Sequence, residues 1–282
     1  MKPCILVHFH ELSLKKDNRP WFEKKFLTNI RHHLKSLPFS SVETNASRVF
    51  IFGIDITLWD EYAKILKCVM GLKNATLMNR AESTMENIKD LSQKIINEIE
   101  FDSFRITTKR QDKGFKYTSQ DINIIIGEYI QNLCEKDVSL NHAQLNIIIE
   151  IVRGKVYIGY KKITGYGGLP NGTSESAVSL LSSGIDSPVA SFHMLKRGVK
   201  IVYVHFHSAP ATNRQSIQNC KKLVNILSQF QLESELYMIP ILPIQKNIMS
   251  EIKDKYWVIL FRRAMVRLAC QLADELKVNA LI

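Results

Sequence analysis

The spacing of apolar and polar residues separates a C-terminal part with regular alternation from an N-terminal part with a mixed pattern. After about residue 175, apolar runs of strand length alternate with longer segments of helical periodicity. The strand-like runs are 177–181, 199–207, 236–241 and 278–282, and the helix-like segments are 189–197, 211–230 and 251–276. This alternation predicts an α/β domain with a parallel, doubly wound sheet.

The first 165 residues predict two smaller α+β units. The first unit has strand-like runs at 4–9 and 49–56 and a helix at 20–37. The second has helices at 62–70, at 85–99 and from Thr118 or Ser119 onward, a strand at 104–108, and a hairpin of 146–152 and 155–160. Four-residue spacing of apolar side chains indicates the helices, and short apolar runs indicate the strands.

A glycine-rich segment joins these units to the α/β domain. It reads Gly165-Tyr-Gly167-Gly168-Leu-Pro170-Asn-Gly172-Thr173-Ser. Glycine at this density is typical of a junction between domains. We therefore divide the chain into domains at 1–58, 59–165 and 166–282.

The charge of the chain favours a polyanionic partner. Lysine and arginine number 38 and aspartate and glutamate 27, which gives a formal net charge of +11 and a pI near 9.4. Such a balance is typical of nucleic-acid binding, although a generally basic surface is an alternative. Within the second unit, Arg105, Lys109, Arg110, Lys113 and Lys116 predict a basic loop region that contacts RNA phosphates. The alternative is a solvated, charged surface.

The cysteines and the apolar runs exclude several classes of protein. Cys4, Cys68, Cys134, Cys220 and Cys270 are dispersed and form no CxxC pair, which argues against disulfides and a zinc site. No apolar run has membrane-spanning length, and the N-terminus lacks a signal peptide. We predict a cytoplasmic protein without membrane contact.

The chemistry of the α/β domain centres on a loop of small residues, Ser182-Ser183-Gly184-Ile185-Asp186-Ser187-Pro188. A strand, a small-residue loop and a helix together form a phosphate-binding arrangement, because backbone amides and the helix N-terminus both attract anions. Asp186 can bind a metal ion or a polar group of the ligand. From composition alone, an ordinary serine-rich turn is equally compatible.

The spacing in this loop resembles the PP-loop, S-G-G-x-D-S, of ATP pyrophosphatases. The longer string from Leu180 to Ala190 resembles the tRNA 4-thiouridine sulfurtransferase family, with Ser183 at a position where the family has glycine. The junction 165–173 and the string His205-Phe206-His-Ser match the same family, and residues 59–165 resemble its RNA-binding THUMP domain. A partial match to the family's ferredoxin-like N-terminal domain covers the stretch from His10 to Arg19.

The resemblance implies a set of site residues. Leu180, Leu181, Ser182, Ser183, Gly184, His205, Phe206 and Arg262 would bind ATP, which is used with Mg²⁺. Asp186 and Ser187 would act in catalysis. A serine tolerates positive φ or close approach to phosphate poorly, so we expect Ser183 to weaken ATP binding.

The resemblance also implies a reaction and its partners. The uridine at the eighth position of tRNA would be adenylated, and a protein persulfide charged by a cysteine desulfurase would then displace AMP. A sulfur-carrier protein for the thiazole of thiamine is a further partner in many members, and a homodimer is compatible with the resemblance. None of the five cysteines has an activating context, and the family's persulfide cysteines lie beyond residue 282.

Because the parallel sheet is incomplete at Ile282, we expect residues 1–282 to bind ATP weakly or not at all and not to complete thiolation alone. Two other functions are compatible with the sequence. One is another THUMP-containing tRNA-modifying enzyme, such as a methyltransferase that uses S-adenosylmethionine. The other is a non-catalytic tRNA-binding protein. A nucleotide-binding measurement separates the three hypotheses.

Overall fold

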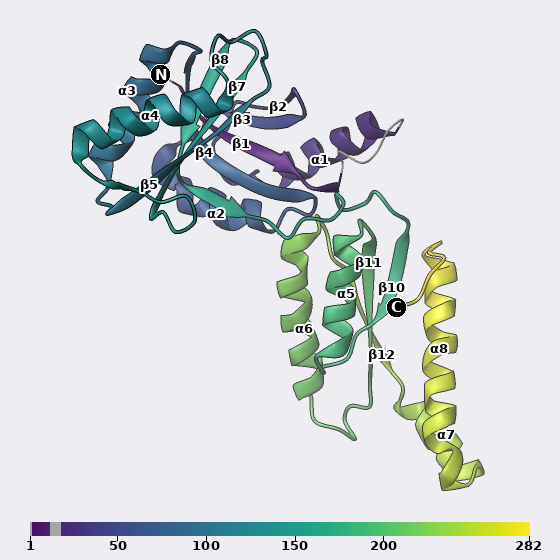
Figure 1. Cartoon of the computed structure of the whole chain (residues 1–282). Coiled ribbons are helices and arrows are strands. Elements are labelled where there is room, and N and C mark those ends of the chain that lie inside the picture. Colours follow the sequence, from purple (N-terminus) through teal and green to yellow (C-terminus); the bar gives the residue numbers. More distant parts are fainter. Residues whose placement is uncertain (1, 12–17) are drawn as a thin grey trace. The chain divides into compact units, whose positions relative to one another are not determined.

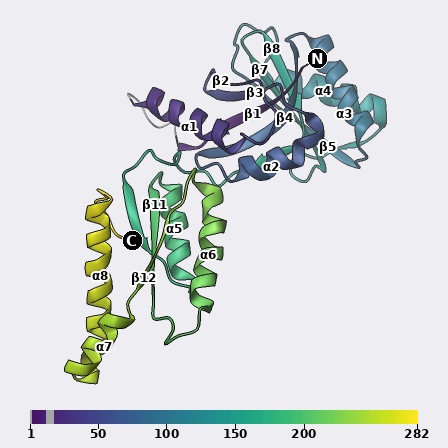
Figure 2. The same cartoon turned by 180° about the vertical axis from the view of Figure 1, so that it is seen from behind.

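The computed structural model describes residues 2–11 and 18–282, so part of the N-terminal stretch that resembles the family, residues 12–17, lies outside the described residues. The described chain forms two compact units (Figures 1 and 2). Unit 1 contains the described residues of 1–9 with 34–67 and 73–164, and unit 2 contains those of 10–33 with 68–72 and 165–282.

Unit 1 is built on one mixed sheet. Its strands are β1 (Lys2–Phe9), β2 (Ser41–Asn45), β3 (Arg48–Phe52), β4 (Leu72–Glu82), β5 (Ser103–Arg110), β6 (Asp137–Val138), β7 (Leu145–Val152), β8 (Lys155–Gly159) and β9 (Lys162–Thr164). Their order among the described residues is β2-β3-β1-β4-β8-β7-β5-β6, and β9 pairs with β4. The predicted hairpin is confirmed as the antiparallel pair β7–β8.

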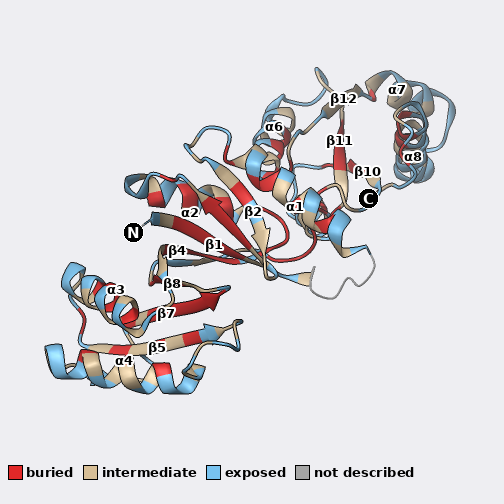
Figure 3. Ribbon diagram, turned by 90° about the horizontal axis from the view of Figure 1, so that it is seen from above, coloured by how far each residue is buried: buried red, intermediate tan, exposed pale blue. Residues whose placement is uncertain are grey.

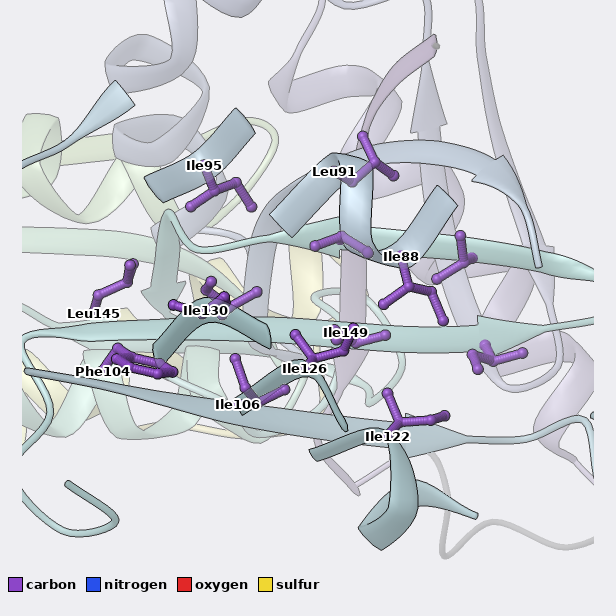
Figure 4. Close-up of a cluster of buried hydrophobic side chains, with 14 of the residues drawn as sticks. Ile88, Leu91, Ile95, Phe104, Ile106, Ile122, Ile126, Ile130, Leu145 and Ile149 are labelled. Atoms are coloured by element: carbon purple, nitrogen blue, oxygen red, sulfur yellow. The ribbon is translucent and has the colours of Figure 1, made fainter. Parts of the chain in front are cut away.

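The helices of unit 1 are η2 (Ile56–Leu58), α2 (Trp59–Lys67), α3 (Met85–Glu98) and α4 (Ser119–Cys134). Helix α4 begins as predicted, because Thr118 and Asp121 exchange side-chain-to-backbone hydrogen bonds in a capping box. Ile122, Ile126 and Ile130 recur on one face of α4 and pack with α3 against β5 and β7 (Figure 4). Figure 3 shows buried residues along the strands of this sheet and exposed residues on the outer faces of both helices.

Unit 2 contains the predicted parallel sheet. Strands β10 (Ser176–Leu180), β11 (Lys200–His207) and β12 (Leu236–Pro240) pair in this order, all parallel. The predicted fourth strand, 278–282, pairs with β10 through a parallel bridge at Leu281. The Val178 N–H donates to the Ala280 carbonyl at 2.9 Å, and the Ile282 N–H donates to the Val178 carbonyl at 2.9 Å.

Helices cover both faces of this sheet, which confirms the doubly wound arrangement. The helices of unit 2 are α1 (Arg19–His33), α5 (Asp186–Lys196), α6 (Gln215–Leu227), η3 (Ser228–Phe230), α7 (Leu242–Glu251), η4 (Asp254–Tyr256) and α8 (Trp257–Glu275), of which α5, α6 and α8 cover the sheet. Helices α5 and α6 pack on the face that carries Ile201 and Tyr203. Helix α8 packs on the face that carries Val202 and Val204.

Several elements differ from the sequence prediction. The helix predicted over 251–276 is α8, which begins only at Trp257 because a turn and η4 occupy the preceding residues, and the helix α7 before it, Leu242–Glu251, was not predicted. The helix predicted to reach residue 37 ends at His33. Strands β2 and β4 were not predicted. Strand β4 carries polar residues at several positions and is recognisable only from its pairing with β8 and β9.

The glycine-rich junction is a packed segment of unit 2. Leu169 and Asn171 are buried, and the Leu169 N–H donates to the Lys196 carbonyl at 3.0 Å. A Cβ at Gly168, where φ is +78°, would lie 2.0 Å from that same carbonyl oxygen. Glycine is therefore required by both backbone conformation and space. Among the described residues, no helix has the length and apolar character that crossing a membrane requires.

Candidate nucleotide site and basic surface

The PP-loop, residues 182–187, connects the end of β10 to the start of α5. Hydrogen bonds of its serine side chains stabilise the loop. The Ser182 N–H donates to Ser187 Oγ at 2.9 Å, and the two hydroxyl oxygens are 3.0 Å apart. The Gly184 N–H points to Ser182 Oγ at 3.3 Å. Ser187, predicted as catalytic, therefore fixes the shape of the loop in this structure.

Helix α5 begins without a side-chain cap. Its N-cap residue is Ile185, which makes no capping hydrogen bond and is 77% exposed. Pro188 in the first turn has no N–H to satisfy. The remaining first-turn amides and the positive end of the helix dipole face outward at an exposed loop, which is a suitable arrangement for binding an anion.

Asp186 and Ser183 are exposed beside this helix end. The backbone at Ser183 lies outside the left-handed region, since the described non-glycine residues with positive φ do not include it. The conformational reason for requiring glycine is therefore absent. Whether serine hinders the approach of a phosphate stays a prediction.

The end of β11 lies beside the PP-loop. The Leu181 N–H donates to the Val204 carbonyl at 2.8 Å, and His205 Nδ1 lies 2.8 Å from the Leu181 carbonyl oxygen. His205 is buried, and its Nε2 has no hydrogen-bond partner among the described residues. The structure thus brings the predicted residues Leu181 and His205 together, as expected for the carboxyl ends of adjacent parallel strands.

Sequence reasoning did not single out Cys220, whose Sγ lies 3.2 Å from His205 Nδ1. Burial raises the pKa of the Cys220 thiol. Burial of this kind makes a thiol a poor nucleophile, because it disfavours the thiolate.

Arg262, also predicted to bind ATP, is exposed on α8. The C-terminal half of this helix packs on the sheet, through the buried residues Ala269, Leu272 and Ala273. Arg262 lies in the N-terminal half, and its guanidinium has no hydrogen bond or ion pair within the described parts of the chain. Its role toward a nucleotide stays a prediction.

The five basic residues predicted to form one loop region separate into two groups. Arg105 and Lys109 lie on β5, on the face opposite the core residues Phe104 and Ile106. Burial and the charges of Lys109, Arg105 and Lys73 lower the pKa of Lys162. Lys162, on β9, therefore belongs to the same basic surface, which we define as Lys73, Arg105, Lys109 and Lys162.

Arg110 is the last residue of β5, and Lys113 and Lys116 lie in the turn that follows. Arg110 Nη1 donates to the Phe115 and Tyr117 carbonyls at 2.8 and 2.9 Å, so this side chain holds the turn. Lys113 and Lys116 are exposed. The prediction of a single basic loop was wrong, because the β5 strand extends through Arg110 and directs alternate side chains to opposite faces.

A buried carboxylate lies beneath the basic surface. Glu150, on β7, is 1% exposed and accepts from Arg48 Nε at 2.5 Å. Its other oxygen lies 3.0 Å from His8 Nε2 and 4.0 Å from Lys109 Nζ. Burial alone would raise the pKa of Glu150, but the hydrogen bond and charge of His8 and the guanidinium of Arg48 lower it overall.

Comparison with known proteins identifies the family. The probable tRNA sulfurtransferase of Thermus thermophilus is 34% identical over 276 residues, which cover 98% of this chain and 68% of the relative. The probable tRNA sulfurtransferase of Clostridium kluyveri is 36% identical over 282 residues, which cover 99% of this chain and 73% of the relative. The chain belongs to the tRNA sulfurtransferase (ThiI) family. The resemblance found in the PP-loop and the junction is thereby confirmed.

Three family models match successive segments of the chain. They are the ThiI ferredoxin-like domain at 4–76, the THUMP domain at 82–161 and the thiamine biosynthesis protein ThiI at 172–282. A crystal structure of a 4-thiouridine synthetase–RNA complex with bound ATP matches with a TM-score of 0.85 and 29% identity, over 100% of this chain and 73% of that one. PH1313 from Pyrococcus horikoshii matches with a TM-score of 0.72 and 28% identity, over 88% of this chain and 82% of that one.

Proposed function

We propose that this protein uses ATP to adenylate the uridine at the eighth position of tRNA, as the first step of 4-thiouridine formation. The observation that carries the proposal is the uncapped N-terminus of α5 behind the serine-braced PP-loop, with His205 at the end of the adjacent strand. A structural neighbour with 29% identity contains bound ATP and RNA, which supports this assignment.

The chain's own residues would contribute positioning and electrostatics. The first-turn amides of α5 would hold phosphate oxygens, and the fixed hydrogen bond between Ser182 and Ser187 keeps the loop in shape before the nucleotide binds. The buried His205 carries an unpartnered Nε2 at the strand end, where the nucleoside part of ATP would lie.

The Mg²⁺ that accompanies ATP would be held by Asp186. No cluster of three or more His, Cys, Asp or Glu side chains suited to a metal ion occurs among the described residues. A single exposed carboxylate fits Mg²⁺, which commonly uses one or two protein carboxylates together with substrate phosphates. Such an ion would neutralise phosphate charge.

The proposed chemistry has two stages. The O4 atom of the uridine attacks the α-phosphate of ATP, the bond to the β-phosphate oxygen breaks, and pyrophosphate leaves. The outer sulfur of a protein persulfide, charged by a cysteine desulfurase, then attacks C4, and AMP departs with the original oxygen. A second cysteine thiol attacks the resulting S–S bond, which leaves sulfur on C4 as 4-thiouridine and forms a protein disulfide that a thiol reductant must reduce. A role in supplying sulfur to a carrier protein for thiamine thiazole would use the same adenylation chemistry.

The test follows AMP transfer. The chain is incubated with unmodified tRNA and millimolar ATP labelled at the α-phosphate, so that weak nucleotide binding does not hide turnover. We expect labelled AMP on the RNA and a matching release of pyrophosphate. RNA binding without AMP transfer would instead indicate a non-catalytic tRNA-binding protein, and binding of S-adenosylmethionine would indicate a methyltransferase.

The basic surface of unit 1 is proposed to contact tRNA phosphates. Replacing both Lys109 and Lys162 with glutamine should reduce the magnitude of the slope of log affinity against log salt by about 1.4 to 1.8, since each lost phosphate contact removes about 0.7 to 0.9. Filter binding over a salt series measures the slope. The double variant Lys89→Gln, Lys94→Gln on α3, across the sheet, is the matched control. An unchanged slope for the Lys109 and Lys162 variant would contradict the assignment.

A further inference from the structure

An apolar groove begins at the PP-loop and runs between α5 and α6, which cover the same face of the parallel sheet. It has a volume of about 470 Å³ and starts at Ser183 and Gly184. Ile185 and Val189 form the α5 side, and Leu223 and Ile226 form the α6 side. The groove therefore adjoins the proposed ATP site and lies wholly within unit 2.

The side chains along this groove are unusually exposed for their type. Ile185 is 77% exposed, Ile226 54% and Val189 47%. The core beneath them is filled by other residues, including Leu195, Tyr203 and Val224. The three exposed side chains are therefore not needed to fill the core, and their position beside a reactive site indicates a binding surface.

Aromatic rings lie at the groove's far end. Phe192 and Phe230 line it, and their ring centroids are 5.1 Å apart. The ring of Tyr166 packs edge-on against both, at 5.3 and 5.4 Å. Phe230 is buried in the core, whereas Phe192 is half-buried and Tyr166 is 40% exposed, so these two rings offer the accessible surface on which a nucleobase can stack.

The stretch of chain that supplies the whole lining of the groove has an excess of basic residues. Residues 183–230 contain six lysine or arginine residues, of which Arg197 pairs with Glu11, and a single acidic residue, Asp186. An apolar groove in a basic stretch matches the chemistry of a nucleotide, whose flat base can stack on apolar surface and whose phosphates are anionic.

We infer that this groove receives the base of the reacting nucleotide after it leaves the stacked structure of the tRNA. The inference rests on the proposed function and names the site of its RNA substrate. The O4 atom of a uracil inside a folded tRNA cannot reach a phosphate held at the PP-loop, and enzymes that modify bases solve this problem by extruding the target base into a pocket. A pocket for the extruded base must adjoin the PP-loop, and this groove begins there.

The size of the groove argues for a base over a protein segment. Stable protein–protein interfaces use about 20 to 30 residues on each side. The groove offers ten lining residues. A volume of about 470 Å³ suits a small ligand such as a nucleoside.

A photochemical cross-link locates the base directly. The chain is bound to tRNA that carries a single 4-thiouridine at position eight, which is the photoreactive product base, and the complex is irradiated with long-wavelength ultraviolet light. Mass spectrometry should find cross-links in peptides that contain residues 185–192 or 223–230. Cross-links that form only elsewhere would overturn the inference. If the chain binds no tRNA in a filter assay, both the inference and the proposed function fail.

A double variant tests the groove's contribution to the reaction. Val189→Gln with Ile226→Gln should lower cross-link yield and kcat/KM for AMP transfer to tRNA by about tenfold, as expected from loss of the packing of one base. Affinity for tRNA should change by less than about threefold, because phosphate contacts dominate it. The control is Ile124→Gln on α4, which is 52% exposed and outside the groove. Unchanged cross-linking and AMP transfer in the double variant would overturn the inference and favour a protein partner.

Discussion

Replacing Glu150 with glutamine should destabilise unit 1 by about 3 kcal/mol. The substitution leaves the Arg48 guanidinium, whose side chain is 13% exposed, without its carboxylate partner. Breaking a buried ion pair by removing one partner typically costs about 3 to 5 kcal/mol, because the remaining charge loses both water and its counter-charge. We expect the lower end of this energy range, because Arg48 also donates a hydrogen bond to the Ala46 carbonyl and keeps that partner in the variant.

Unfolding in urea measures this loss within unit 1. Trp59 is buried in unit 1, whereas Trp21 and Trp257 belong to unit 2. A background with Trp21→Phe and Trp257→Phe therefore makes the fluorescence report unit 1 alone. The midpoint should fall by about 1 to 3 M urea, given a typical slope of about 1 to 3 kcal/mol per molar.

The matched control is Glu82→Gln. Glu82 pairs with Lys155 at the surface of the same sheet and its side chain is 67% exposed, so its loss should cost less than about 1 kcal/mol. Equal effects for the two substitutions would contradict the stabilising role of the buried pair.

The effect of Glu150→Gln should depend on pH. Because the pKa of Glu150 is lowered in the folded protein, its stabilising contribution is complete above the ordinary glutamate value of 4.5 and is lost as the pH falls through the lowered pKa. The difference between the native protein and the variant should therefore be full at pH 7 and shrink below pH 4.5. A difference that grows on acidification would show that another group is responsible.

Asp186→Ala should reduce AMP transfer to tRNA by at least about 100-fold. Groups that stabilise developing charge in a transition state typically contribute about 10² to 10³ in rate. Asp186 is the only carboxylate in residues 183–230 and lies beside the proposed phosphate site. Single-turnover AMP transfer at saturating tRNA measures the effect.

Asp186 also occupies the first turn of a helix, where a carboxylate contributes about 0.3 to 1 kcal/mol through the helix dipole. Asp60→Ala in the first turn of α2 is therefore the matched control. Both variants should lose similar, small amounts of stability, and only Asp186→Ala should lose activity. Retained activity in Asp186→Ala would exclude the aspartate from the mechanism.

The sequence by itself determined the local elements and the family. Four-residue apolar spacing located α3 and α4, and the strand–helix alternation located the parallel sheet, because both depend on neighbours within a few turns of the chain. The PP-loop and the glycine-rich junction carried enough specific residues to identify the family without structural information. In the junction, the need for glycine at Gly168 lies in its backbone conformation and its contact with the Lys196 carbonyl.

Only the tertiary structure decided which distant residues meet. Glu150 gave no signal in the sequence, because its partners His8 and Arg48 lie more than 100 residues away. Lys162 lies in the basic surface because β9 pairs with β4, and no local pattern in the sequence indicates this pairing. The polar strand β4 and the groove between α5 and α6 likewise depend on packing between elements. Such contacts follow from the register of strands and the faces of helices, which no local pattern specifies.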